Sequence, residues 1–322
     1  MGGKPKAAFL DFATLGPGID TGVLDRLLDV TYFPYSTEAE IPARLAGCEV
    51  AIVNKVRLSA DAIGAARDLR LIVLSATGTD NVDTAAAKRS GIAVANSRDY
   101  CTSSVVQHVF ALVLCLTQNV IAYDRLSRSG SWSRSRSFAL FDHPIRELAG
   151  RALGIVGYGT LGRSVAAVAR AFGMRVLVSA RPKAPADQVP PDRLPFLEVL
   201  AEADVLTLHC PLNDETRHMI GAPELARMKP DALLINTARG ALVDNAALAD
   251  ALRARRIGGA GIDVLPVEPP DDDQPLLAPD IPNLIVTPHV AWAALEARQR
   301  ALDQIAENVA AFFAGEELRR VV

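Results

Sequence analysis

The 322-residue chain has a formal net charge of -3, and half of its residues are hydrophobic while 22% are charged. This composition is typical of globular proteins and excludes disordered, fibrous and membrane-spanning classes. Because the chain has no long basic run, no apolar span and no secretory signal, we expect no nucleic-acid partner, no membrane partner and a cytoplasmic location.

Short apolar runs alternate with helix-like segments along the first hundred residues. The runs "CEVAIVNK" and "LRLIVLSATG", for example, flank the helical pattern "SADAIGAARD". This alternation of strand and helix signals predicts a parallel sheet with helices on both faces. The length of the chain indicates about two domains of this kind.

A helical pattern from about Ser103 to Leu126 predicts one long helix after this first series. The polar segment "SRSGSWSRSRSF", which contains Trp132, follows it. The segment is either a solvated loop or an arm that crosses to a partner subunit, because an aromatic ring in a polar excursion often needs a surface that buries it.

A second series of apolar runs starts at "RALGIVGYG" and continues to "NLIVTPHV". These runs do not alternate with polar residues, which is typical of strands that are buried on both faces. The final segment, "ALEARQRALDQIAENVAAFFAG", has the period of an amphipathic helix that ends at Gly315. We therefore predict an α/β protein with two Rossmann-like, doubly wound parallel-sheet domains and a cleft between them, the first domain being completed by this last helix.

A glycine-rich turn separates the strand "ALGIV" from the helix "LGRSVAAVARAF". Glycines allow a tight turn and a close approach of the backbone, and a helix N-terminus offers free N–H groups to a pyrophosphate. Placed between a strand and a helix, the pattern predicts a dinucleotide site. The expected cofactor-binding residues of the turn are Gly157, Tyr158, Gly159, Thr160, Leu161 and Gly162.

The end of the next strand lacks the acidic residue that NAD-specific units use to bind the adenosine ribose. The sequence there reads Ala180, Arg181, Pro182, and Lys183 follows. Positive charge at this position suits the 2′-phosphate of NADP, so we expect NADP(H) to be favoured. The alternative is that Arg181 is a solvated surface residue and that NAD(H) binds through its pyrophosphate.

Three later strands each end in a polar residue, namely Arg239 in "NTARG", Asp263 in "GIDVLPVEP" and His289 in "VTPHVAW". The carboxyl ends of parallel strands meet at one edge of a sheet, so these side chains can converge. Reduction of a 2-keto acid needs a cation for the carboxylate and carbonyl, which suits Arg239, and a proton donor, which suits His289. Glu268, if bonded to the imidazole, would orient it and favour its protonated form.

Two further residues keep alternative interpretations. Asp263 could position Arg239, contact the nicotinamide amide or merely end a strand, and His209 in "LTLHCP" either lines the cofactor crevice or packs structurally. The histidines at positions 108, 143 and 218 are assigned no chemistry.

The chain resembles the D-isomer-specific 2-hydroxyacid dehydrogenase family, on "GYGTLG", "HCPLNDETRHMI", "LINTARGALVDNAAL", "GIDVLPVEP" and "VTPHVAW". Earlier, "VNKV", "LSATGTDNVD" and "YCTSSVVQHVFALVL" are similar to the hydroxypyruvate reductase (glycerate dehydrogenase) branch. The resemblance implies that Arg239, Glu268 and His289 are catalytic. It also implies a discontinuous substrate domain of residues 1–99 plus 291–322, a dinucleotide-binding domain of residues 100–290, and a homodimer joined partly through an arm at about 120–148.

The resemblance extends the expected sites beyond the glycine turn. The substrate would contact Lys55, Ala76, Thr77, Gly78, Thr79 and Arg239. The further cofactor-binding residues would be Ala180, Arg181, Pro182, His209, Cys210, Pro211, Thr216, Thr237, Ala238, Arg239, Asp263, His289 and Ala291. No metal site is expected, since the four cysteines show no metal-ligand spacing and predict free thiols.

The expected activity is NAD(P)H-dependent reduction of hydroxypyruvate or glyoxylate to D-glycerate or glycolate, and the reverse. One alternative is another substrate specificity within the family, such as formate, phosphite or phosphoglycerate. A second alternative, from a different class, is a nucleotide-sensing binding protein like the family's transcriptional corepressors, because a fold alone does not determine function.

Overall fold

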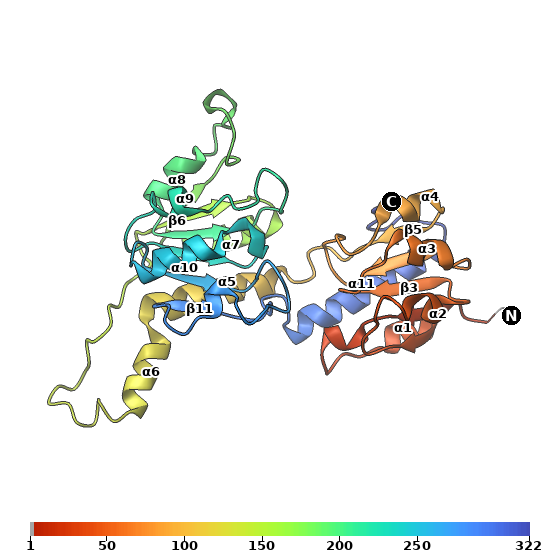
Figure 1. The fold of residues 1–322 in the computed structure, drawn as a ribbon, viewed down its shortest axis with the longest axis horizontal. Helices are drawn as coiled ribbons and strands as arrows, with labels where there is room; N and C mark the ends of the chain where they lie inside the picture. The colour runs from red at the N-terminus through yellow and green to blue at the C-terminus, as the bar shows by residue number, and fades with distance from the viewer. Residues whose placement is uncertain (1–2) are drawn as a thin grey trace. The chain divides into compact units, whose positions relative to one another are not determined.

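The computed structural model describes residues 3–322, which form two compact units (Figure 1). Unit 1 consists of residues 3–101 and Trp292–Val322, and unit 2 is Thr102–Ala291. Each unit holds a parallel β-sheet between layers of helices, which confirms the predicted α/β class.

Unit 1 has a five-stranded sheet in the order β2-β1-β3-β4-β5, in which every neighbouring pair is parallel. Its strands are β1 (Lys6–Phe9), β2 (Asp29–Tyr32), β3 (Val50–Val53), β4 (Leu71–Leu74) and β5 (Ala93–Ala95). Its helices are η1 (Phe12–Leu15), α1 (Gly22–Leu27), α2 (Ile41–Leu45), α3 (Ala60–Ala65), α4 (Thr84–Arg89) and α11 (Leu295–Phe313).

The core of unit 1 lies on both faces of this sheet, because β3 and β4 are buried along their whole length. On one face, Leu302 and Ile305 of α11 pack with Phe9 of β1. On the other face, Ile41 of α2 and Ile63 of α3 belong to the second cluster. Gly315 takes a φ of +80° just beyond the end of α11, as expected of a C-terminal glycine.

Unit 2 has a six-stranded parallel sheet in the order β11-β10-β9-β8-β6-β7. Its strands are β6 (Ala152–Val156), β7 (Arg175–Val178), β8 (Val205–Leu208), β9 (Leu233–Asn236), β10 (Gly259–Ile262) and β11 (Leu284–Val286). Its helices are α5 (Thr102–Gln118), α6 (Val120–Arg128), α7 (Thr160–Ala171), η2 (Ala186–Gln188), α8 (Phe196–Glu202), α9 (Ala222–Leu225), η3 (Gly240–Leu242), α10 (Asn245–Arg253) and η4 (Pro275–Leu277).

The strand order of unit 2 decides where a ligand can bind. The first strand, β6, lies between β7 and β8, so successive connections leave it in opposite directions. The loops at such a switch point diverge and leave a crevice outside the carboxyl ends of the strands. The glycine turn after Val156 is one of these loops.

The prediction of one long helix from about Ser103 to Leu126 is wrong. The structure has two helices there, α5 and α6, whose axes meet at an angle of 55° at Asn119. Asn119 takes the left-handed conformation with a φ of +52°, which asparagine tolerates better than most residues. Its side-chain amide donates to the Pro144 carbonyl at 2.7 Å, which fixes the bend. Between residues 3 and 322, no single helix is long and apolar enough to cross a bilayer, and α5 with α6 passes such a test only as this bent pair.

Candidate active site

The three glycines of the turn after β6 meet different surroundings. At Gly157, which has a φ of +97°, an added Cβ would lie 2.5 Å from the Cys210 backbone nitrogen. At Gly162 it would lie 2.2 Å from the Gly157 carbonyl oxygen. At Gly159, apart from its chain neighbours, no heavy atom of the described residues lies within 4 Å. Two glycines are therefore required by packing, while the third borders open space.

That open space lies at the N-terminus of α7, whose N-cap residue is Gly159. Among the residues that the structure describes, no side chain caps this end of the helix, so the N–H groups of its first turn are left for a ligand. Such N–H groups and the positive end of the helix dipole are suited to a diphosphate.

The segment after β7 carries positive charge and no carboxylate. Ser179 and Ala180 are buried, and the Ser179 hydroxyl donates to the Ala180 carbonyl at 2.7 Å. Arg181 and Lys183 are exposed. The first acidic residue beyond β7 is Asp187 in η2.

Two buried polar atoms lack partners where β8 and β9 end. Leu208 of β8 pairs with Asn236 of β9, so the next residues, His209 and Thr237, follow neighbouring strands at the same level. Within the described part of the chain, His209 Nδ1 and Thr237 Oγ1 are buried with no hydrogen-bond partner. Buried polar atoms normally have partners, so this pair fits a polar ligand that satisfies them. The open space at Gly159 and these two atoms are consistent with a bound dinucleotide.

The imidazole of His209 is held neutral. Burial lowers the pKa of His209 to about 4, and its Nε2 lies 2.9 Å from the Thr207 hydroxyl. Next to it, burial raises the pKa of the Cys210 thiol to about 11. The loop then closes through the Thr216 hydroxyl, which donates to the Pro211 carbonyl at 2.8 Å.

A histidine and a glutamate meet beyond the ends of β10 and β11. His289 Nδ1 lies 2.6 Å from Glu268 Oε2, and the other carboxylate oxygen of Glu268 accepts the Leu265 N–H at 2.8 Å. The two side chains remain 27% and 34% exposed, so solvent and small molecules can reach the pair. Because Nδ1 is engaged, the Nε2 atom of His289 is the nitrogen left for a substrate.

Arg239 follows β9 on a neighbouring loop. Its side chain is exposed, and its guanidinium donates to the Ala238 carbonyl at 2.8 Å. An added Cβ at Gly240 would lie 2.0 Å from the Leu265 carbonyl carbon, so the loop of Arg239 packs directly against the loop that leads to Glu268.

Asp263 uses its buried carboxylate to organise the loop of His289. The side chain accepts the Thr287 hydroxyl at 2.6 Å and the backbone N–H groups of Val290 and Ala291 at 2.9 Å each. Two of the alternatives for Asp263 were that it positions Arg239 and that it merely ends a strand. These contacts favour neither of the two. His108 of α5, which the sequence analysis assigned no chemistry, lies 3.5 Å from the same carboxylate.

The predicted substrate-binding residues Lys55 and those at positions 76–79 belong to unit 1. Lys55 follows β3, and residues 76–79 follow β4, so both lie beyond carboxyl ends of that sheet. Asp11, which is 2% exposed, accepts the backbone N–H groups of residues 54, 55 and 56 at 2.6–3.1 Å. Asp11 is not among the site residues predicted from the sequence, although it stands as an acidic residue directly after the apolar run "AAFL".

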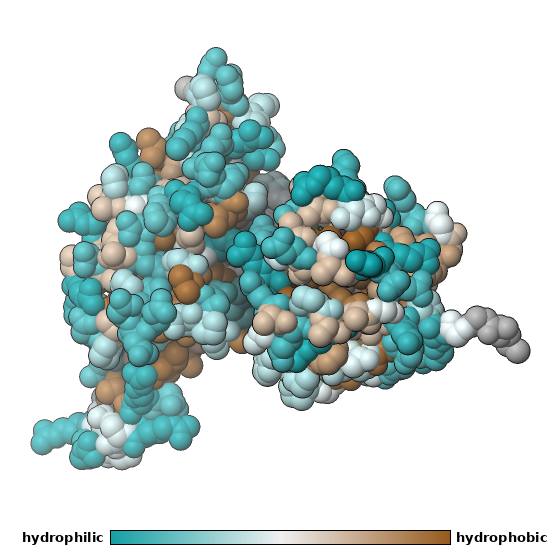
Figure 2. All heavy atoms as spheres, turned by 45° about the vertical axis from the view of Figure 1, so that its right-hand side comes forward, coloured by the Kyte–Doolittle hydropathy of each residue, from teal (hydrophilic) through white to brown (hydrophobic). Residues whose placement is uncertain are grey.

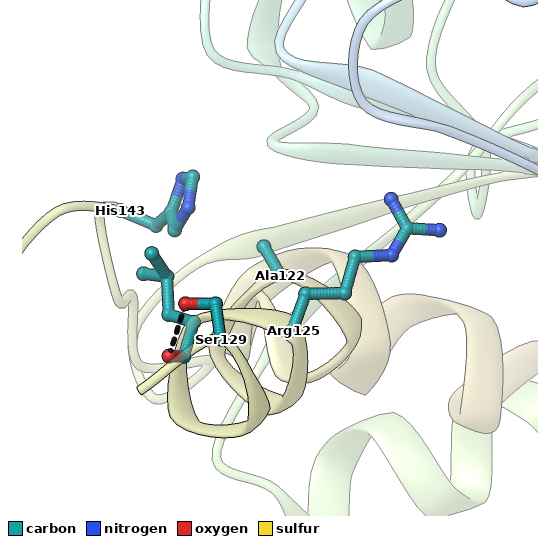
Figure 3. Close-up of a pocket in the computed structure, with 5 residues that line it drawn as sticks. Ala122, Arg125, Ser129 and His143 are labelled. Carbon is teal, nitrogen blue, oxygen red and sulfur yellow. Dashed lines mark hydrogen bonds between the residues drawn. The ribbon is translucent and has the colours of Figure 1, made fainter. Parts of the chain in front are cut away.

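The arm, which consists of α6 and the segment that follows it toward β6, contains none of the predicted catalytic, substrate-binding or cofactor-binding residues. A shallow pocket there is lined by Ala122, Arg125, Leu126, Ser129 and His143 (Figure 3), and none of them is a predicted site residue. Farther along, Phe138 and Phe141 are 90% and 82% exposed, and the Trp132 indole donates to the Phe138 carbonyl. Figure 2 shows apolar surface near the place where the arm leaves unit 2.

A parallel α/β sheet, a glycine turn before an uncapped helix and a histidine–glutamate pair at strand ends define a dinucleotide-dependent oxidoreductase. The family described as D-isomer specific 2-hydroxyacid dehydrogenase, NAD binding domain, matches residues 110–291. The chain belongs to the D-isomer specific 2-hydroxyacid dehydrogenase family, as its motifs predicted, and its cofactor is a nicotinamide dinucleotide.

Three known proteins illustrate the similarity. Glycerate dehydrogenase of Methylorubrum extorquens is 50% identical over 280 residues, which cover 87% of each chain. The structure of the TT0316 protein from Thermus thermophilus matches with a TM-score of 0.85 and 34% identity, over 99% of this chain and 100% of that one. The NADPH-dependent glyoxylate/hydroxypyruvate reductase of Sinorhizobium meliloti, in complex with NADP and malonate, has a TM-score of 0.81 and 28% identity, over 99% and 97%.

Proposed function

We propose that this enzyme reduces hydroxypyruvate and glyoxylate to D-glycerate and glycolate, and that it prefers NADPH. One observation carries the proposal. His289 Nδ1 lies 2.6 Å from Glu268 Oε2, and this pair follows strands of the same sheet whose strand β6 leads into the glycine turn. The similar proteins named glycerate dehydrogenase and glyoxylate/hydroxypyruvate reductase support this substrate class.

The reaction assigns one task to each side chain. A nicotinamide cofactor, when bound, would supply the hydride for C2 of the keto acid. His289, through Nε2, donates the proton that the developing alkoxide takes up, and Glu268 stabilises and orients the imidazolium from the other side of the ring. Arg239 binds the substrate carboxylate and polarises the carbonyl with its planar guanidinium.

The remaining site residues serve binding in this proposal. Lys55 and residues 76–79 hold the substrate carboxylate and hydroxyl group. The N-terminus of α7 would bind the pyrophosphate. His209 Nδ1 and Thr237 Oγ1 would form hydrogen bonds with the cofactor. His209 suits this role because its neutral ring keeps one nitrogen as an acceptor.

NADPH preference rests on the segment after β7. Arg181 is exposed, and no carboxylate directly follows β7 to repel a phosphate. A guanidinium binds a 2′-phosphate through charge-assisted hydrogen bonds, each of which stabilises binding by about 1.5–3 kcal/mol.

A homodimer that joins through the arm completes the proposal. In the single chain, the large apolar side chains of Phe138 and Phe141 are exposed to solvent. Aromatic residues are enriched at protein interfaces, where such side chains become buried. Sedimentation of the purified protein at twice the chain mass is expected, and a monomer at micromolar concentration would contradict this assembly.

The first experiment measures kcat/KM for hydroxypyruvate and for glyoxylate, each with NADPH and with NADH, on the purified protein. Turnover that favours NADPH supports the proposed substrates and the proposed cofactor preference. Turnover that favours NADH keeps the substrate class but removes the role of Arg181, while the absence of turnover with either cofactor refutes the proposed substrates.

A further inference from the structure

The backbone of the proposed proton donor is held in an unusual conformation. His289 has a φ of +54°, in the left-handed region that residues other than glycine seldom adopt. Its N–H donates to the backbone carbonyl of Asp263 at 2.8 Å. Such a conformation persists only where the surrounding contacts determine it, and at functional sites it commonly places a side chain.

The contacts that hold this backbone converge on the Asp263 side chain. Its carboxylate accepts the Thr287 hydroxyl two residues before His289, and the N–H groups of Val290 and Ala291 just after it. Asp263 is 1% exposed, so these hydrogen bonds do not compete with water. The loop is thus fixed on both sides of the histidine by one buried carboxylate.

His108 extends this network from α5. Its Nε2 lies 3.0 Å from the Thr287 hydroxyl oxygen and 3.5 Å from Asp263 Oδ1. The single proton of the Thr287 hydroxyl is donated to the carboxylate, which only accepts, so the hydroxyl oxygen must accept from His108. His108 therefore carries a proton on Nε2.

We propose that His108 and Thr287 are positioning residues for His289. His108 orients the Thr287 hydroxyl, Thr287 orients the Asp263 carboxylate, and Asp263 fixes the left-handed backbone that aims the imidazole at the substrate. His108 lies on the helix that begins unit 2, and Ser104 of the same helix donates to the carbonyl of Ala291, the last residue of that unit, at 2.6 Å. The proposal rests on the proposed reductase function for its catalytic part.

The test compares variants that remove each hydrogen bond with variants that keep it. His108→Phe keeps a ring but no donor, and Thr287→Val keeps the shape of threonine without the hydroxyl, whereas His108→Gln and Thr287→Ser keep the polar groups. For the first two we expect kcat for hydroxypyruvate to fall about ten- to a hundred-fold with KM for the keto acid and for the cofactor within about two-fold, because small misplacement of a reacting group is costly.

The conservative variants Thr287→Ser and His108→Gln should retain most of the wild-type kcat. The double variant His108→Phe/Thr287→Val should be little worse than either single variant, since both act through Asp263. An unchanged kcat in the first two variants would overturn the proposal, and so would equal losses in the conservative variants.

Amide hydrogen exchange of the segment 287–291, measured on the protein without substrate, supplies a readout that does not depend on turnover. We expect faster exchange in His108→Phe and Thr287→Val and wild-type exchange in Thr287→Ser, at unchanged protection of β6. Unchanged exchange in the first two variants refutes the network. If the wild type reduces neither keto acid, the proposed function fails, and the exchange result still decides whether His108 holds the loop.

Discussion

The Nδ1 atom of His289 lies 2.6 Å from Oε2 of Glu268, although the two residues are separated by 21 positions in the chain. A carboxylate at this distance orients the ring and leaves its Nε2 for the substrate. The remaining oxygen of Glu268 is fixed by the Leu265 N–H, so the carboxylate itself does not rotate freely.

The pair should therefore behave as one catalytic unit. His289→Gln is expected to lower kcat by about a hundred- to ten thousand-fold, which is the usual contribution of a general acid. Glu268→Gln should lower it less, and the double variant should match His289→Gln, because Glu268 acts only through the imidazole. Steady-state kinetics of the three variants, with cofactor affinity from NADPH fluorescence as the control, tests this. Additive losses would contradict the unit.

Arg239→Lys should chiefly weaken substrate binding. An ammonium cannot reproduce the bidentate contact of a guanidinium with a carboxylate, so KM for hydroxypyruvate should rise about ten- to a hundred-fold. Arg256→Lys, at an exposed position of the same unit, is the matched control and should leave KM unchanged. An Arg239→Lys enzyme with normal KM would remove Arg239 from the substrate site.

The glycine turn offers a separation of binding from folding. Gly159→Ala places its methyl in open space at a φ of -81°, so the protein should fold normally and bind cofactor at least about ten-fold more weakly. Gly157→Ala places the methyl 2.5 Å from the Cys210 nitrogen and should lower the free energy of unfolding by about 3 kcal/mol. Thermal melts and NADPH titrations distinguish the two effects, and equal cofactor affinity of Gly159→Ala and wild type counts against the pyrophosphate site.

Charge at the end of β7 should set the cofactor preference. Arg181→Ala is expected to raise KM for NADPH about ten-fold or more while KM for NADH changes little, because only NADPH carries the 2′-phosphate. Arg175→Ala serves as the control, since Arg175 begins β7 and Arg181 follows its other end. Equal increases in KM for NADPH and for NADH in Arg181→Ala would show that Arg181 does not bind the 2′-phosphate.

Burial of His209 predicts a pH dependence of stability. Its pKa is about 4 in the folded protein, against 6.5 in the unfolded chain, so between these values only the unfolded state binds the proton. The free energy of unfolding should therefore decrease as pH falls from 6.5 to 4, by roughly 3 kcal/mol from this group, and no further below that.

Urea unfolding of the cofactor-free protein from pH 4 to 7 measures this slope. His209→Asn should show a shallower decrease over the same window, because it removes the proton uptake of one group. His218→Asn, at an exposed position with a left-handed φ that asparagine accepts, should retain the wild-type slope. Identical slopes in His209→Asn and wild type would indicate that another group titrates in this window.

The sequence by itself determined the α/β class, the glycine turn and the family. Strands buried on both faces appear as continuous apolar runs, and a turn that needs glycine at fixed spacing is a local property, so both are readable along the chain. The missing carboxylate near Ala180 is equally local, because it concerns only the residues directly after β7.

Only the tertiary structure decided the bend at Asn119, the left-handed backbone of His289 and the network of Asp263 with His108. The amide of Asn119 bonds to Pro144, 25 residues later, and the helical pattern continues through the bend without a signal. His108 contacts Thr287 across 179 residues. A polar residue in a helix can face solvent or a buried partner, and no local pattern distinguishes the two, because the partner is supplied by a strand that is distant in the sequence.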